Sequence, residues 1–154
     1  MFLYRISKTK FIKDLSGIGA KEQGGRWNNI GIPVIYTSDS TSLAVLEFLA
    51  NIKLTAAPKK TSIAKINFPD TLIIEYIRLK DLPANWHLYP APKKLADLGS
   101  DWARRKSSVA LCVPSAQVPN SPDRNYILNP NHSDFTKITI EEVIPYSFDK
   151  RLVT

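Results

Sequence analysis

The apolar residues of this chain occur in short runs of strand length, which prolines and glycines separate. Two ranges, 41–52 and 92–106, instead carry apolar residues at helical spacing, and Asp39 or Ser40 can cap the first of these helices. The runs that predict strands are 2–6, 34–37, 62–68, 71–77, 109–113, 126–128 and 138–144. Many short strands and few helices are typical of an α+β domain rather than a doubly wound parallel sheet.

The size and residue types of the chain indicate one domain, residues 1–154, in a reducing compartment. With 44% apolar residues, a core can form without disulfides or a structural metal. Cys112 is the single cysteine, and His87 and His132 make no obvious metal pair, so we expect no metal site. No apolar run reaches the length of a membrane span, and the N-terminus lacks a signal-peptide pattern, so we expect a cytoplasmic protein.

The net charge of +7 is distributed unevenly along the chain. Residues 1–60 hold nine basic and four acidic side chains, whereas residues 61–154 hold twelve and ten. A basic first third suggests an anionic partner, either a nucleic acid or a small molecule that bears phosphate. A solvated basic surface is the more ordinary explanation of the charge alone.

Glycines crowd residues 14–31, and this density predicts an irregular loop of the kind that carries function in small domains. Within it, Arg26 follows Gly24-Gly25 and precedes Trp27 and Asn28. Paired glycines let the backbone approach a ligand closely, and the planar guanidinium of Arg26 suits a pyrophosphate. Trp27 can stack on a ligand or anchor the loop. A surface turn with a solvated arginine is the competing interpretation.

Glu47 is the one carboxylate in the apolar run 43–49, on the same helical face as Leu43 and Ala50. A buried carboxylate is costly unless it is paired. Glu47 is therefore expected either to bond Arg26 or Arg5 or to face a ligand cleft, and a purely structural ion pair is an equally good interpretation.

Two further side chains stand at predicted strand ends. Tyr36 ends the strand after the glycine-rich segment, where its ring can stack on a flat ligand or join the core. Ser115 follows the buried strand 109–113, without the G-x-S-x-G pattern of a serine hydrolase, so it is expected to make a hydrogen bond or to serve in a turn. His132 lies in a turn-rich segment and is expected to be structural.

Together these segments resemble the RES family, whose name records an Arg, a Glu and a Ser. The three occur here in order, as Arg26 in Gly-Gly-Arg-Trp-Asn, Glu47 in Leu-Ala-Val-Leu-Glu and Ser115 in Val-Pro-Ser-Ala. The further matches are Tyr4-Arg5-Ile6, Ile35-Tyr36-Thr37-Ser38, Leu82-Pro83-Ala84-Asn85-Trp86, and Asn129-Pro130 with His132 and Asp134-Phe135. The resemblance covers about residues 2–140.

The resemblance implies a split, mostly antiparallel β core like that of ADP-ribosyltransferases, and a toxin that cleaves the nicotinamide–ribose bond of NAD⁺ by hydrolysis or phosphorolysis. NAD⁺ is then the substrate, and no separate cofactor is expected. An Xre-type antitoxin would block the cleft and provide the only, indirect, link to nucleic acid.

Roles for named side chains also come from the resemblance. Glu47 would stabilise the positive charge that develops on the ribose, or hold a ribose hydroxyl. Arg26, with Arg5, would bind the pyrophosphate, Tyr36 would stack on nicotinamide, and Ser115 would orient the ribose or the amide. The remaining expected NAD⁺ contacts are Trp27, Asn28 and Asn129.

Three other functions stay open at this point. A mono-ADP-ribosyltransferase would share the first chemical step and differ in its acceptor, which could be water, phosphate or a protein. An RNA-targeting toxin would account for the charge of +7, although no RRM or KH signature is present. A binding module without activity is the third, and the intact Arg, Glu and Ser argue against it.

Overall fold

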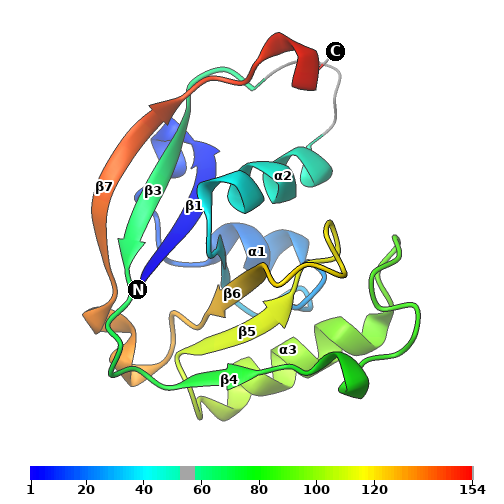
Figure 1. Cartoon of the computed structure of the whole chain (residues 1–154). Helices are drawn as coiled ribbons and strands as arrows, with labels where there is room; N and C mark the ends of the chain where they lie inside the picture. The colour runs from blue at the N-terminus through cyan, green and yellow to red at the C-terminus, as the bar shows by residue number, and fades with distance from the viewer. Residues whose placement is uncertain (53–57, 154) are drawn as a thin grey trace.

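A computed structural model describes residues 1–52 and 58–153 of the chain (Figure 1). Within these residues one sheet has the strand order β4-β5-β6-β2-β1-β3-β7. The strands are β1 (Phe2–Lys8), β2 (Ile35–Ser38), β3 (Thr61–Asn67), β4 (Ile74–Tyr76), β5 (Ala110–Pro114), β6 (Arg124–Leu128) and β7 (Thr139–Tyr146). Only β4 and β5 pair in parallel among these strands, so the prediction of an α+β domain with a mostly antiparallel core is confirmed.

The sheet divides between β1 and β2. β1 pairs with β3 along its whole length, from Phe2 opposite Asn67 to Lys8 opposite Thr61. Its pairing with β2 is limited to Tyr4 opposite Ser38. One half of the sheet is thus β1-β3-β7 and the other is β4-β5-β6-β2, which is the split core that the resemblance implied.

Three α-helices flank the sheet: α1 (Ile18–Gln23), α2 (Thr41–Asn51) and α3 (Lys93–Arg105). Short 3₁₀ turns occupy Thr9–Phe11, Leu79–Asp81, Ser133–Lys137 and Lys150–Leu152. α2 lies beside β1 and β2, and α3 runs along β4 and β5 (Figure 1). No helix in the described ranges is long and apolar enough to cross a membrane.

The short connection from β2 to α2 fixes the start of that helix. Of the two predicted caps, Ser40 makes the capping bond, because its Oγ accepts from the amide of Leu43 at 3.1 Å. Asp39 instead accepts a hydrogen bond from the amide of Arg124 in β6. Leu43 and Ala44 are the buried residues of α2, whereas Leu46 is 39% exposed, so the inward face of the helix is narrower than its apolar spacing indicated.

Two local predictions were wrong. The segment 14–31 was expected to be irregular, yet it contains α1, which begins after Gly17 and ends before Gly24. Both glycines have a positive φ, +74° and +70°, so they serve as the conformational stops of a short helix. The strand expected over 71–77 is restricted to β4, because a turn with a bond from Leu72 N to Pro69 O precedes it.

Two clusters of buried side chains bear on how the glycine-rich segment 14–31 is held. One cluster packs Leu3, Ile66 and Leu128 along the sheet. A second cluster places Trp27 against Trp102 of α3, with strand residues beneath them. An added Cβ at Gly99 of α3 would stand 1.8 Å from the carbonyl oxygen of Trp27, so the helix and the segment pack backbone to backbone. This packing fixes the segment that carries Arg26.

Candidate active site

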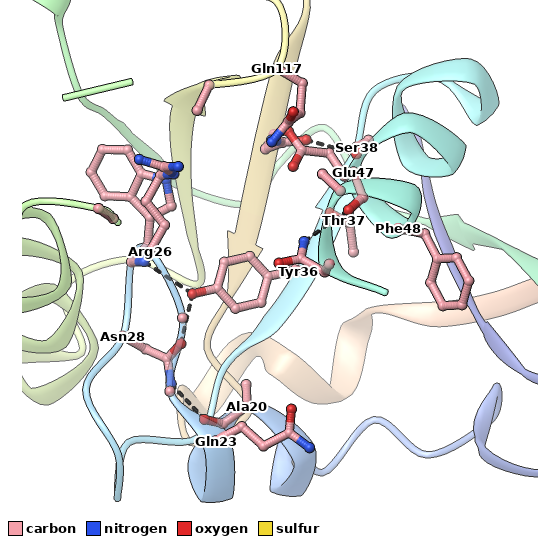
Figure 2. Close-up of a pocket in the computed structure, with 18 of the residues that line it drawn as sticks. Ala20, Gln23, Arg26, Asn28, Tyr36, Thr37, Ser38, Glu47, Phe48 and Gln117 are labelled. Carbon is pink, nitrogen blue, oxygen red and sulfur yellow. Dashed lines mark hydrogen bonds between the residues drawn. The ribbon is translucent and has the colours of Figure 1, made fainter. Parts of the chain in front are cut away.

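A cavity of about 890 Å³ opens between α2, the segment 19–30, and the ends of β2, β5 and β6 (Figure 2). Its volume is that of a site for a small organic molecule. Of the predicted site residues, the cavity wall includes Arg5, Arg26, Trp27, Asn28, Tyr36 and Glu47. Ser115 and Asn129 are not part of this wall.

Glu47 projects from α2 and lines the cavity. Its Oε1 accepts two hydrogen bonds of 2.6 Å, from Oγ of Ser115 and from Nδ2 of Asn125. Within the described residues Oε2 accepts no hydrogen bond, and no arginine lies within ion-pair distance of the carboxylate. The expected bond to Arg26 or Arg5 is therefore wrong, and the alternative, a carboxylate facing a cleft, is confirmed.

Ser115 contacts Glu47 but does not line the cavity. It directly follows β5, it is 1% exposed, and its Oγ both donates to Glu47 and accepts from the amide of Gln117 at 3.1 Å. A hydroxyl with both functions engaged holds a neighbour in place. The structure thus supports a hydrogen-bonding serine that orients the carboxylate, and it corrects the expectation that Ser115 orients the ribose or the amide directly.

Asn125, which the sequence analysis did not single out, is the second partner of Glu47. It stands in β6 opposite Ser38 of β2, and Oγ of Ser38 donates to its Oδ1 at 2.7 Å. Unlike Ser115, Asn125 lines the cavity. Its contact with Glu47 spans 78 positions, so no local pattern marks it, and only the pairing of β6 with β2 brings it to the site.

Arg26 projects from the glycine-rich segment into the cavity wall opposite Glu47 (Figure 2). Its Nη1 donates to the carbonyl oxygens of Trp86 and Leu88, at 2.8 and 3.0 Å. Burial lowers the pKa of Arg26 and the nearby Glu47 charge raises it, but an arginine stays cationic in either case. Arg26 thus fastens the 86–88 segment and keeps Nε and Nη2 for a ligand.

Arg5 brings a second cation to the same cavity from β1. Its Nη1 donates to the carbonyl oxygens of Ile12 and Asp14, at 3.1 and 2.7 Å. Burial lowers the pKa of Arg5, and the charge of Asp14 raises it. In the described part of the chain neither Arg5 nor Arg26 has a carboxylate within 4 Å, so both keep charge for an anion.

Tyr36 lies between Arg26 and Glu47 in the view of Figure 2. Its hydroxyl donates to Oδ1 of Asn28 at 2.6 Å and accepts from the amide of Trp27 at 3.1 Å. Burial raises the pKa of Tyr36, so the hydroxyl stays protonated. The hydroxyl is fully engaged by the protein, and the ring is what Tyr36 offers to a ligand.

Asn28 and Trp27 support the site from within the fold. Asn28 is 1% exposed, and its Nδ2 donates to the carbonyl oxygens of Ala20 and Ile32 at 2.8 and 3.1 Å. Trp27 is 3% exposed and packs in the core. Of the two roles left open for Trp27, the structure supports the loop anchor. Both residues also line the cavity, so their expected contacts with NAD⁺ stay a prediction beside these structural roles.

Asn129 lies outside the cavity, and its expected contact with the substrate is also corrected. Its Nδ2 donates to the carbonyl oxygen of Ala103 at 2.9 Å, and its Oδ1 accepts from the amide of Asn131 at 3.0 Å. It is 1% exposed and serves to join β6 to α3. His132 caps the 3₁₀ turn Ser133–Lys137 through its Nδ1, so its structural role is confirmed.

Other polar side chains of the cavity were also not expected from sequence. Gln23, His87 and Gln117 line it from three separate segments. Only His87 had a local signal, because it directly follows Trp86 of a segment that already resembled a known family. Across residues 1–52 and 58–153, no group of three His, Cys, Asp or Glu is placed to hold a metal ion.

Comparison with known proteins identifies relatives over nearly the whole chain. Residues 2–149 match the RES domain family. Toxin Res of Yersinia enterocolitica is 36% identical over 154 residues, 99% of each protein. Toxin Res of Photorhabdus laumondii is 38% identical over 156 residues, 99% of this chain and 97% of that protein. The Prs ADP-ribosylating toxin of a Sphingobium species is 33% identical over 149 residues, 96% and 91%.

A solved structure shares the fold at lower sequence identity. A chain of the M. tuberculosis MbcT–MbcA toxin–antitoxin complex superposes with a TM-score of 0.71 and 19% identity, covering 95% of this chain and 84% of that one. The agreement extends across both halves of the split sheet, since nearly all of the chain is covered.

Proposed function

Because this chain belongs to the RES domain family, whose curated relatives here are toxins, we propose that it is a toxin enzyme that cleaves the nicotinamide–ribose bond of NAD⁺. The observation that carries the proposal is the setting of Glu47. One of its carboxylate oxygens is fixed by Ser115 and Asn125, and the side chain lines a cavity of about 890 Å³ that also holds two arginines.

The chemistry follows from these groups. When the bond between C1′ of the ribose and the nicotinamide nitrogen breaks, both electrons leave with nicotinamide, which departs as a neutral molecule and needs no general acid. Positive charge develops on the ribose, and Glu47 stabilises it through the oxygen that the protein leaves free. The acceptor oxygen then bonds to C1′ and loses its proton to solvent.

The remaining wall of the cavity suits the rest of NAD⁺. Arg26 and Arg5 bring two cations for the pyrophosphate, and guanidinium groups match phosphate oxygens in geometry as well as in charge. Tyr36 presents its ring for stacking on nicotinamide. NAD⁺ is the substrate in this scheme, and no separate cofactor takes part.

Water and phosphate are the acceptors that this proposal favours. A protein acceptor is the second candidate, because one relative at 33% identity is named as an ADP-ribosylating toxin. All three acceptors share the step at Glu47, and they differ in what enters the cavity afterwards. The RNA-targeting alternative has no comparable support, since the described cavity holds a fixed carboxylate as well as its two arginines.

We also propose a protein partner, an antitoxin of the Xre type that covers the cavity in the cytoplasm. A solved relative of the same fold was determined as a toxin–antitoxin complex. Two large apolar side chains at the cavity wall are open to solvent: Ile30 is 73% exposed and Tyr89 is 91% exposed. They border a cavity that also holds the carboxylate and the two arginines. Such a border is suited to burial by another protein.

The test is the release of nicotinamide from NAD⁺ by the purified protein, with and without phosphate, beside Glu47→Gln. Glutamine keeps an oxygen for Ser115 and Asn125 but removes the charge, so we expect the release rate to fall about a thousandfold with the melting temperature little changed. Glu22→Gln, an exposed site outside the cavity, is the matched charge control.

The buffer arms of this experiment separate the acceptors. Faster release with phosphate indicates phosphorolysis, and equal release indicates hydrolysis. If nicotinamide is released only when a cell extract supplies protein, the acceptor is a protein. No release under any of these conditions, or full activity of Glu47→Gln, contradicts the proposal.

A further inference from the structure

We propose that Asn125 is a positioning residue for the reaction, and that the Ser38–Asn125 pair holds the carboxylate of Glu47 in one orientation, with one oxygen left free for the ribose. The inference rests on the proposed function and extends it to two residues outside the Arg, Glu and Ser of the family name. It starts from an asymmetry in the carboxylate: both protein donors bind Oε1, at 2.6 Å each, so Oε2 is the oxygen available to a ligand.

The amide of Asn125 has a defined orientation. An asparagine side chain can be flipped so that its oxygen and nitrogen exchange places, and then the oxygen would face the carboxylate and repel it. Because the carboxylate of Glu47 only accepts, it selects Nδ2 of Asn125, and Oγ of Ser38 donates to the remaining Oδ1 at 2.7 Å and anchors the amide to β2. Ser38 is 3% exposed, so little of its side chain is open to water.

The two residues of the pair stand on rigid backbone. Ser38 and Asn125 are direct partners in the β2–β6 ladder, and Asn125 is also paired with Val113 of β5. Glu47 belongs to α2, whose cap at Ser40 begins two residues after Ser38. The sheet therefore fixes Asn125 independently of the helix that carries the carboxylate, and the hydrogen bond ties one to the other.

A fixed carboxylate matters because the ribose gains charge only during the reaction. A carboxylate that rotates freely holds an oxygen in the productive position for only part of the time, whereas one fixed by hydrogen bonds holds it there at every encounter. Asn125 acts on the chemical step through Glu47, so its loss should lower kcat and leave the affinity for NAD⁺, which the arginines provide, nearly unchanged.

The experiment measures kcat and KM for NAD⁺ with the wild type, Asn125→Ala and Ser38→Ala. We expect Asn125→Ala to lower kcat by about thirtyfold with KM within about twofold, and Ser38→Ala to lower kcat by a smaller factor, because the amide keeps its bond to Glu47 but loses its anchor on β2. Thr61→Val is the control: it removes a buried side-chain hydrogen bond, to the carbonyl oxygen of Tyr146, in the other half of the sheet. Its kcat should equal that of the wild type.

Asn125→Asp provides a readout that a merely structural role would not move. A second carboxylate beside Oε1 of Glu47 favours protonation of the pair, so the acidic limb of the kcat–pH profile should move to higher pH by about one unit. This variant also decides the matter if Asn125→Ala does not fold, as judged by its thermal melt.

The inference is overturned, with the proposed function left intact, by a folded Asn125→Ala with the kcat of the wild type or by an Asn125→Asp profile that coincides with that of the wild type. A lowered kcat accompanied by an equal fall in the Thr61→Val control also contradicts it. Absence of nicotinamide release by the wild type is a different result, since it refutes the proposed function itself.

Discussion

The hydroxyl of Tyr36 and Oδ1 of Asn28 share a hydrogen bond of 2.6 Å at the point where the glycine-rich segment meets β2. The same hydroxyl accepts from the amide of Trp27, and Asn28 donates onward to α1 and to Ile32. The hydroxyl of Tyr36 therefore helps to hold the segment that carries Arg26 against the sheet, while the ring of Tyr36 remains in the cavity wall. The two halves of this side chain can be tested separately.

Tyr36→Phe removes the hydroxyl and keeps the ring. We expect the free energy of unfolding to fall by about 1–3 kcal/mol, because Oδ1 of Asn28 and the amide of Trp27 lose a buried partner. KM for NAD⁺ should stay within about twofold, since stacking needs only the ring. Urea unfolding and steady-state kinetics measure the two effects. Tyr36→Leu removes the ring as well, and an unchanged KM in that variant would exclude stacking.

Arg26→Ala should weaken the capture of NAD⁺. The loss of one charge-assisted contact to the pyrophosphate predicts a rise in KM of about tenfold or more. The melting temperature should also fall, because the carbonyl oxygens of Trp86 and Leu88 lose their donor. Arg78→Ala, which removes an exposed arginine paired with Asp81, is the control. A KM equal to that of the wild type would remove Arg26 from the pyrophosphate site.

Gly99→Ala should destabilise the fold strongly. Its Cβ would stand 1.8 Å from the carbonyl oxygen of Trp27, so α3 must move away from the glycine-rich segment, at a cost of about 3 kcal/mol. Gly19→Ala is the matched control: that helical glycine has no atom within 4 Å of an added Cβ, so alanine should be neutral or stabilising by about 0.5–1 kcal/mol. Equal melting temperatures for both variants would contradict the close packing.

Asp97 makes the attachment of the segment sensitive to acid. The hydrogen bond from Nδ2 of Asn29 and the contact with Lys93 lower the pKa of Asp97 below its ordinary value of 3.8. A carboxyl whose pKa is lowered by folding stabilises the protein above its unfolded pKa, and this contribution is lost as the pH falls through the folded pKa. Wild type should therefore melt above Asp97→Asn at pH 7, and the difference should shrink as the pH falls below 3.8, through the lowered pKa of the folded state. A difference that stays constant between these pH values would exclude the linkage.

Much of the fold could be predicted because the deciding interactions are local. The helix from Thr41 is specified by its apolar spacing and by the capping serine one residue before it. Glu47 could be recognised because it is one charge within an apolar run. The strands followed from β-branched runs, and many short strands beside few helices left little choice of fold class.

The features of the fold and the site that the sequence did not predict depend on contacts that the local sequence does not encode. Asn125 reaches Glu47 only after β6 has paired with β2, and Asn129, four residues later, points into the fold instead. α1 was missed because glycines usually indicate a loop, whereas Gly17 and Gly24 here end a helix at its two sides. The sequence left open whether Glu47 bonds an arginine or faces a cleft, and it did not indicate the neutral donors, Ser115 and Asn125, that bind the carboxylate without cancelling its charge.

The limited pairing between β1 and β2, at Tyr4 and Ser38, leaves a seam in the backbone hydrogen bonding of the sheet, and residues from both sides of it line the cavity. Arg5 is on β1, on one side of the seam, and Tyr36 and Asn125 are on β2 and β6, on the other side, where the hydroxyl of Tyr36 holds the segment that carries Arg26. A molecule that binds both arginines at once would hold the two sides of the seam together. Bound ADP-ribose should therefore slow amide hydrogen exchange in β1 and β2 more than in β5, and uniform protection would show that the seam is already closed in the free protein.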